Sequence, residues 1–261
     1  MKHAKPYIIG FLIATAAITG LSFSETERSH IECAGISIHI NGNDKNHKFI
    51  QDQDIYTIIN SFVDTSDTSS TQRIHDIALY DIEKKIADHP LIESCNVYTT
   101  IDGIITIDIT QRTPLIRIES KHDSFYIDKK GRLMPLSENY TSHTLLASGN
   151  IDAGYREKHN ILLPDDSHDT ILQDLFTIAQ KITQNGLFSA IIEQVYVTSN
   201  NNFILVSKVG PPKIYLGTHT HLDYKLRNLT AFYHSKKARE LWHSYSSINL
   251  KYKNQIVCTK K

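Results

Sequence analysis

The chain has 261 residues, enough for one or two folded domains with hydrophobic cores of their own. It carries 28 Lys plus Arg and 28 Asp plus Glu, so its formal net charge is zero. A nucleic-acid-binding protein needs an excess of basic residues to displace counterions from phosphates, and the balance therefore argues against nucleic acid as a partner. Hydrophobic residues make up 40% of the chain, which predicts a folded globular body. Three cysteines are too few for a disulfide framework, although one pair could close in an oxidising compartment.

The N-terminal region departs from this average, because no charged residue lies between Pro6 and Ser24. As a helix, residues 7–24 would span about 27 Å, close to the ~30 Å hydrocarbon core of a bilayer. We therefore expect a single transmembrane helix over residues 7–24. Lys2 and Lys5 precede it and acidic residues follow it, so the positive-inside rule predicts a cytoplasmic tail at residues 1–6 and an exported remainder. The alternatives are a signal peptide cleaved at the A-x-A site of residues 14–16 and a buried core helix.

The next segment, residues 31–112, predicts a small α+β module. Its apolar residues alternate as in strands or recur at helical spacing, in the order β-α-α-β-β. The expected strands are 31–40, 92–100 and 105–110, and the expected helices are 51–62 and 73–88. Two helices on one face of a short sheet would bury the apolar faces of both.

The region from residue 113 to residue 261 predicts a β-rich domain with two helices. The expected helices lie at residues 171–182 and 222–232. The expected strands are 116–119, 125–128, 145–147, 195–197, 203–207, 213–216 and 247–258. The last of these places Ile248, Leu250 and Tyr252 on one face, with Lys251 and Lys253 on the other. The predicted fold class is therefore α+β throughout, after a single N-terminal transmembrane helix.

Motifs of catalysis and cofactor binding are missing from the sequence. It has no H-E-x-x-H, no G-x-S-x-G and no Walker loop, and we expect no catalytic residue and no cofactor. His219 and His221 would share a face on a strand, but no Cys, Asp or Glu follows at a diagnostic spacing, so we expect no metal site. The acidic pairs Asp165-Asp166 and Asp52/Asp54 lie in polar segments, where nothing raises a carboxyl pKa for acid–base work.

Interaction with other proteins is the better functional class to consider. A strand that ends the chain is often a sheet edge, whose unpaired N–H and C=O groups can accept a strand from another protein. Lysines on such a strand can equally serve to block unwanted pairing, and a plain last strand is the alternative interpretation.

The order of these elements resembles the bacterial cell-division family FtsQ/DivIB, whose members carry a membrane anchor, a POTRA domain and a β domain. The resemblance covers nearly the whole chain. It rests on DIEKKI (81–86) followed by HPLI (89–92), IDITQRTPLIR (107–117), FYID (125–128) with Gly131 and MPLS (134–137), Gly217 with Lys225-Leu226, and INLKY (248–252).

The resemblance implies a non-enzymatic scaffold of the division machinery in the cell inner membrane, with its C-terminal domains in the periplasm. It implies partners similar to the bitopic proteins FtsB and FtsL, bound by the late helix and last strand, and other division proteins bound by the POTRA-like domain. Matched residue by residue, the partner site falls on Ile248, Leu250, Lys251, Tyr252 and Lys253. Two alternatives are a POTRA-bearing envelope chaperone or secretion adaptor that binds extended clients, and an exported hydrolase.

Overall fold

The computed structural model describes residue 15 and residues 32–41, 48–62, 73–163 and 170–261. Apart from Thr15, the expected transmembrane helix at residues 7–24 and the expected cleavage site lie outside the described residues, as does the pair Asp165-Asp166. Among the residues that are described, no helix combines the length and the apolar character that crossing a bilayer requires.

The chain folds into two compact units. Of the described residues, those up to Asn41 and those from Ile50 to Gln111 form the first unit, and Lys48, Phe49 and those from Arg112 to Lys261 form the second. The first unit confirms the predicted β-α-α-β-β order. Its elements are β1 (Gly35–Asn41), α2 (Asp52–Ile59), the 3-10 helix η1 (Ile74–Asp76), α3 (Leu79–Ala87), β2 (Ile92–Thr99) and β3 (Ile104–Gln111).

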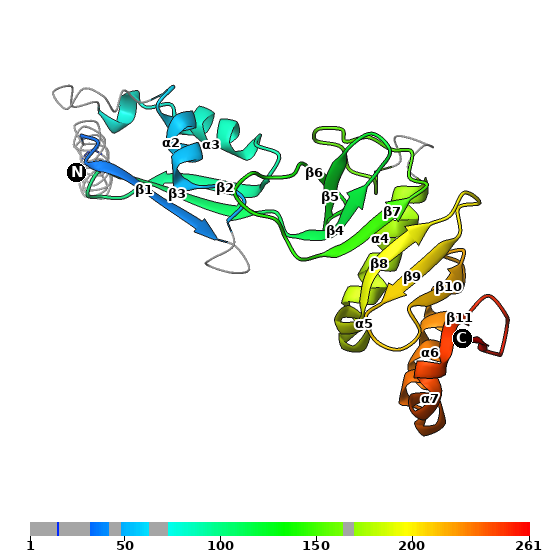
Figure 1. Cartoon of the computed structure of the whole chain (residues 1–261). Coiled ribbons are helices and arrows are strands. Elements are labelled where there is room, and N and C mark those ends of the chain that lie inside the picture. Colours follow the sequence, from blue (N-terminus) through cyan, green and yellow to red (C-terminus); the bar gives the residue numbers. More distant parts are fainter. Residues whose placement is uncertain (1–14, 16–31, 42–47, 63–72, 164–169) are drawn as a thin grey trace, which may run out of the picture. The chain divides into compact units, whose positions relative to one another are not determined.

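The sheet of the first unit has the strand order β1-β3-β2, with β1 parallel and β2 antiparallel to β3. Figure 1 shows α2 and α3 together on one face of this sheet. Ile82 and Ile86 of α3 and Ile107 of β3 are fully buried. The expected helix over residues 73–88 is wrong in one respect. Ile77 has extended backbone angles and a buried side chain, and it separates η1 from α3.

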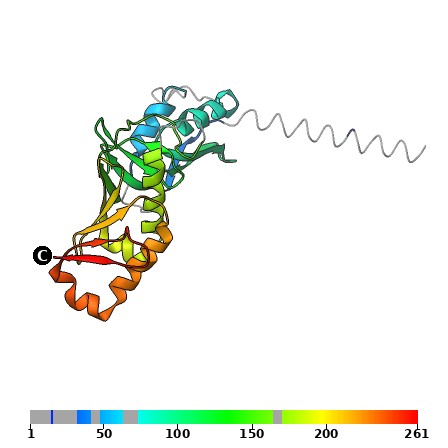
Figure 2. The same cartoon turned by 90° about the vertical axis from the view of Figure 1, so that its right-hand side faces the viewer.

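The second unit contains one nine-stranded sheet with the strand order β12-β11-β10-β9-β8-β7-β4-β5-β6. Its strands are β4 (Pro114–Glu119), β5 (Ser124–Asp128), β6 (Leu133–Met134), β7 (Leu145–Gly149), β8 (Ile192–Val197), β9 (Phe203–Ser207), β10 (Lys213–Gly217), β11 (Tyr245–Asn249) and β12 (Val257–Lys260). Figures 1 and 2 show α4 (Thr170–Thr183) running along one face of the sheet. α4 and α6 (Leu222–His234) bury their apolar residues in one core with the inward side chains of the strands.

The prediction of two helices in this region is incomplete. α4 and α6 are those two, and the structure adds α5 (Gly186–Ile191), α7 (Lys236–Leu241) and the 3-10 helix η2 (Trp242–Ser244). A helix of six residues completes less than two turns, so its sequence cannot display the 3.6-residue repeat from which a helix is predicted.

Candidate partner-binding site

The open edge of the nine-stranded sheet is β12, at the C-terminal end of the chain. Among the described residues, β12 pairs with β11 alone, in antiparallel register from Asn249↔Val257 to Tyr245↔Lys260. Val257, Thr259 and Lys260 are exposed on this strand. The outer N–H and C=O groups of β12 are thus available for a strand from another chain.

This geometry corrects the predicted strand at residues 247–258. That segment forms two strands joined by a loop, because β11 ends at Asn249 and the chain turns back through Asn254, whose φ of 61° lies in the left-handed region. β11 is therefore an interior strand between β10 and β12. Asn and Gly adopt this conformation more readily than other residues, so Asn254 is the local sequence signal for the turn.

The five predicted partner-binding residues divide into two groups. Ile248 lies on β11 and Leu250 just after it, and both side chains are buried in the core. Lys251, Tyr252 and Lys253 follow in the loop and are exposed, with Tyr252 51% accessible. Of the five predicted residues, these last three are therefore the ones with exposed side chains.

Two hydrogen bonds hold this loop against α6. The Asn254 N–H donates to the Tyr224 hydroxyl oxygen at 2.8 Å, and the Tyr224 hydroxyl donates to Asn254 Oδ1 at 2.7 Å. Tyr224 belongs to the first turn of α6, which carries it to the end of the sheet where β10 and β11 finish. Neither residue is indicated by the sequence pattern, since a contact across 30 positions leaves no periodic signal.

A pocket of about 300 Å³ lies between α6 and the loop. Its lining residues are His221, Tyr224, Lys225, Leu250, Lys251, Tyr252 and Lys253. The Lys225 ammonium donates to the Thr218 carbonyl at 2.7 Å, while burial and the nearby Lys251 lower the pKa of Lys225. The pocket therefore combines apolar walls with closely spaced positive charge.

Gly217 determines how Lys251 enters this pocket. It ends β10 with a φ of 76°, and a Cβ atom at this position would lie 3.1 Å from Lys251 Cγ. The absence of a side chain gives the aliphatic stem of Lys251 room to lie across the end of β10.

Two other sheet edges, β6 and β2, are less available than β12. β6, at the opposite edge of the same sheet, has two residues, both buried. On β2, at one edge of the first unit's sheet, the Val97 N–H donates to Glu83 Oε2 of α3 at 3.0 Å. A side chain thus occupies one of the edge groups that an added strand would need.

The histidine pair considered for metal binding does not lie on a strand. β10 ends at Gly217, and His221 adopts a left-handed conformation at the start of α6. His219 Nδ1 lies 3.0 Å from Asp174 Oδ1 of α4, a pairing that sequence spacing did not suggest. Among the described residues, no three His, Cys, Asp or Glu side chains are grouped so that they could hold a metal ion.

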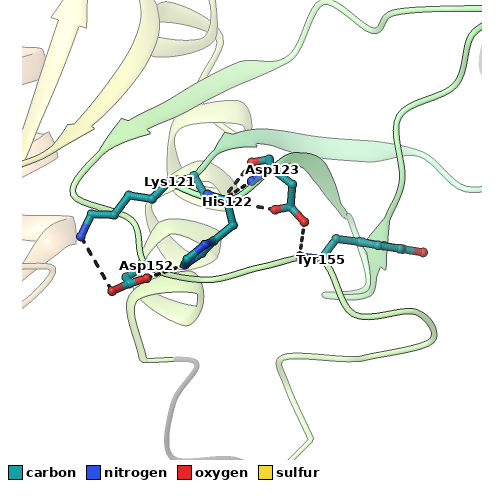
Figure 3. Close-up of polar contacts among 6 residues, drawn as sticks. Lys121, His122, Asp123, Asp152 and Tyr155 are labelled. Carbon is teal, nitrogen blue, oxygen red and sulfur yellow. Dashed lines mark hydrogen bonds and ion pairs between the residues drawn. The ribbon is translucent and has the colours of Figure 1, made fainter.

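A second polar cluster lies in the second unit at the turn between β4 and β5 (Figure 3). Asp152 Oδ1 is 2.7 Å from His122 Nε2, and Lys121 contacts the other carboxylate oxygen at 3.8 Å. The Ser120 hydroxyl donates a hydrogen bond to the Asp123 carbonyl at 2.9 Å and accepts one from the backbone N–H of His122, so it stabilises the turn. Ser120, His122 and Asp152 are thus close in space. Their hydrogen bonds stabilise the turn and hold it against the segment after β7.

The three cysteines are free thiols. Burial, with smaller contributions from Glu83 and Asp108, raises the pKa of Cys95 to about 12. Burial also raises the pKa of Cys258 on β12. A thiol with a raised pKa is a poor nucleophile, so neither site suits covalent catalysis.

Comparison with known protein families places both units. Residues 31–110 match the POTRA-like domain, and residues 113–259 match the family described as FtsQ/DivIB, C-terminal related. No curated protein gives a significant match to the chain. Because the second match spans more than half of the 261 residues, the chain belongs to the FtsQ/DivIB-related family of bacterial cell-division proteins.

Proposed function

We propose that this protein is a non-enzymatic scaffold of the bacterial division machinery that binds partner proteins at the open β12 edge. Val257–Lys260 would pair with an extended segment of a bitopic partner similar to FtsB or FtsL. The exposed loop residues Lys251, Tyr252 and Lys253 and the first turn of α6 would contact the same partner. The single observation that carries this proposal is the position of β12, an exposed edge strand at the end of a nine-stranded sheet.

The proposed arrangement of domains is taken from the sequence. Residues 1–6 would form a cytoplasmic tail and residues 7–24 a helix in the inner membrane. Residues 31–112 would form a POTRA-like domain and residues 113–261 a β domain, both in the periplasm. The uncharged apolar run after Lys2 and Lys5 supports this topology. The POTRA-like domain would contribute contacts to other division proteins.

The proposal assigns no catalytic reaction to this protein, because of what surrounds two groups that could carry one, the His122–Asp152 pair and Cys95. Among the described residues, no hydroxyl or thiol is hydrogen-bonded to the imidazole of the His122–Asp152 pair, and the pKa of Cys95 is too high for a thiolate nucleophile. A scaffold requires neither.

Photo-crosslinking in dividing cells tests the partner site. A photoreactive residue replacing Val257, which is 41% exposed on β12, should form adducts with bitopic division proteins. The matched control replaces Tyr196, which is 43% exposed on β8 of the same unit, and should form few adducts. Equal labelling from the two positions, or a fluorescent fusion that does not gather at midcell, would overturn the proposal.

A further inference from the structure

The zero net charge hides an uneven distribution along the chain. Residues 31–111 contain 13 acidic and 5 basic residues, whereas residues 112–261 contain 13 acidic and 20 basic residues. Most of that excess lies at the very end. Residues 236–261 hold seven basic residues and one acidic residue, while residues 112–235 hold 13 and 12. The segment that carries the excess includes α7, η2, β11 and β12.

The fold gathers one part of this charge at one end of β12. The Lys261 N–H donates to the Ser244 carbonyl at 2.8 Å, which joins the C-terminus to η2. The Ser246 hydroxyl lies within 3.2 Å of the carbonyl oxygens of Thr259 and Lys260. Because η2 follows α7 directly, the end of α7 at Leu241 lies close to the last two lysines. We call the surface formed by α7, η2, Lys260 and Lys261 the basic end.

Apolar groups accompany these charges. Leu241 at the end of α7 is 42% exposed, and Val209 in the turn before β10 is 40% exposed. The Trp242 ring packs edge-on against Tyr233 at 6.2 Å and lies over Gly210, while its indole N–H donates to His243. Exposed apolar side chains around a packed tryptophan are typical of the core of a protein-binding surface, and the lysines would form its polar rim.

Within the described part of the chain, Lys236, Lys260 and Lys261 form no ion pair with a carboxylate. Lysines that merely protect a sheet edge from unwanted pairing are placed on the edge strand itself. Here three of the basic residues belong to the sequence of α7, which is outside the sheet and ends at exposed Leu241. Edge protection therefore accounts for Lys260 but not for the basic end as a whole.

We propose that the basic end binds an acidic stretch of the partner polypeptide, next to the segment that pairs with β12. This inference rests on the proposed function. β12 has only four residues, so a partner strand of ordinary length extends past Lys260 and reaches α7. Acidic side chains there would be attracted to a surface with the opposite charge, which accelerates association and fixes the register.

Labelled 15-residue peptides test the proposal on the full-length protein. Each has a central Val/Thr strand core, and its flanks carry four Glu, four Gln or four Lys. At about 50 mM salt we expect the Glu peptide to bind about tenfold more tightly than the Gln peptide. The difference should nearly vanish at about 0.5 M salt, where screening shortens the reach of exposed charges to a few ångströms.

Two triple variants locate the effect. Lys236→Gln, Lys260→Gln and Lys261→Gln together should abolish the preference for Glu, so that this variant binds the Glu and Gln peptides equally. The matched control, with Lys121, Lys129 and Lys130 changed to Gln, removes the same charge near β4–β6 and should retain the preference. Thermal melting of both variants checks that the fold is intact.

The outcomes separate the two proposals. If the Glu and Gln peptides bind equally, the basic end has no acidic ligand and the inference is overturned, while edge pairing stands. If no peptide binds, edge pairing fails and the inference fails with it. Stronger binding of the protein to phosphatidylglycerol vesicles than to the Glu peptide, lost in the first triple variant, would assign the basic end to lipid and also overturn the inference.

Discussion

Gly149 occupies a position that no other residue fits. It ends β7 with a φ of 105°, and a Cβ atom there would lie 2.2 Å from the Val197 carbonyl oxygen. We expect Gly149→Ala to lower the free energy of unfolding by at least about 2 kcal/mol, since both backbone strain and a backbone clash oppose it. Gly186→Ala is the control. Gly186 begins α5 with open space around it, and alanine there should be neutral or stabilise by up to about 1 kcal/mol. Chemical denaturation measures both, and equal effects would contradict the assignment.

Tyr155 is the opposite case, because removing its hydroxyl group should not lower the stability of the fold. Among the described atoms its buried hydroxyl has no hydrogen-bond partner, and burial raises its pKa. Its ring packs near Phe125 at 6.3 Å, so phenylalanine would keep the apolar contacts. Tyr155→Phe should therefore leave the melting temperature unchanged or raise it, by the equivalent of up to about 1 kcal/mol. A clear drop in melting temperature would show that the hydroxyl makes a stabilising bond, for example to an internal water.

Asp152 should make stability depend on pH in the acidic range. Its hydrogen bond with His122 and the nearby Lys121 lower its pKa in the folded state. A carboxyl with a lowered pKa stabilises the fold above its unfolded pKa of about 3.9, and this contribution is lost as the pH falls through the folded value. The wild type should therefore melt above Asp152→Asn at pH 6, and the gap should close at lower pH. Asp102→Asn, in the exposed turn after β2, is the control and should show no such closing gap.

At the scale of elements, the periodicity of apolar residues predicted the long, amphipathic helices and strands. α4 and α6 and the strands of the first unit follow from apolar residues at regular spacing, and the structure confirms them. Periodicity failed at the C-terminal hairpin for a physical reason. The alternation of Ile248, Leu250 and Tyr252 continues past the end of β11, because Leu250 is still buried after the strand has ended. The turn depends on Asn254 and on Tyr224, a distant residue that no local pattern indicates.

Tyr252 tests whether the loop after β11 belongs to the partner site. Its side chain is half exposed, so Tyr252→Ala should change the unfolding free energy by less than about 1 kcal/mol. Recovery of a bitopic division protein with the tagged chain should nevertheless fall several-fold. Tyr196→Ala, at a similarly exposed tyrosine on β8, should leave recovery unchanged. Equal recovery for Tyr252→Ala and the wild type would remove the loop from the site.

At the scale of the whole molecule, the sequence suggested a basic last strand, and the fold shows where the lysines of that segment lie. Lys251 lies in a pocket with Lys225, whereas Lys260 and Lys261 lie beside η2 at the other end of β12. These two groups adjoin opposite ends of one four-residue edge. A segment that pairs with β12 would thus meet positive charge at both of its ends, which sequence position alone could not have indicated.

The two units are built from interleaved stretches of the chain, and this arrangement predicts which substitutions destabilise each unit. Phe49 precedes α2 in sequence, yet it belongs to the second unit. Its ring contacts Tyr140 at 5.1 Å and Tyr126 at 6.0 Å, and its carbonyl accepts a hydrogen bond from Ser137 Oγ.

Phe49→Ala should therefore destabilise the second unit by about 3 kcal/mol, as expected for a buried phenylalanine, and leave the first unit unchanged. Ile82→Ala, in the core of α3, should do the reverse. Hydrogen exchange resolved by peptide distinguishes the two, because protection should fall in β5 and β7 for the first variant and in β2 and β3 for the second. Loss of protection confined to β2 and β3 in Phe49→Ala would assign Phe49 to the first unit and would require the boundary between the units to be redrawn.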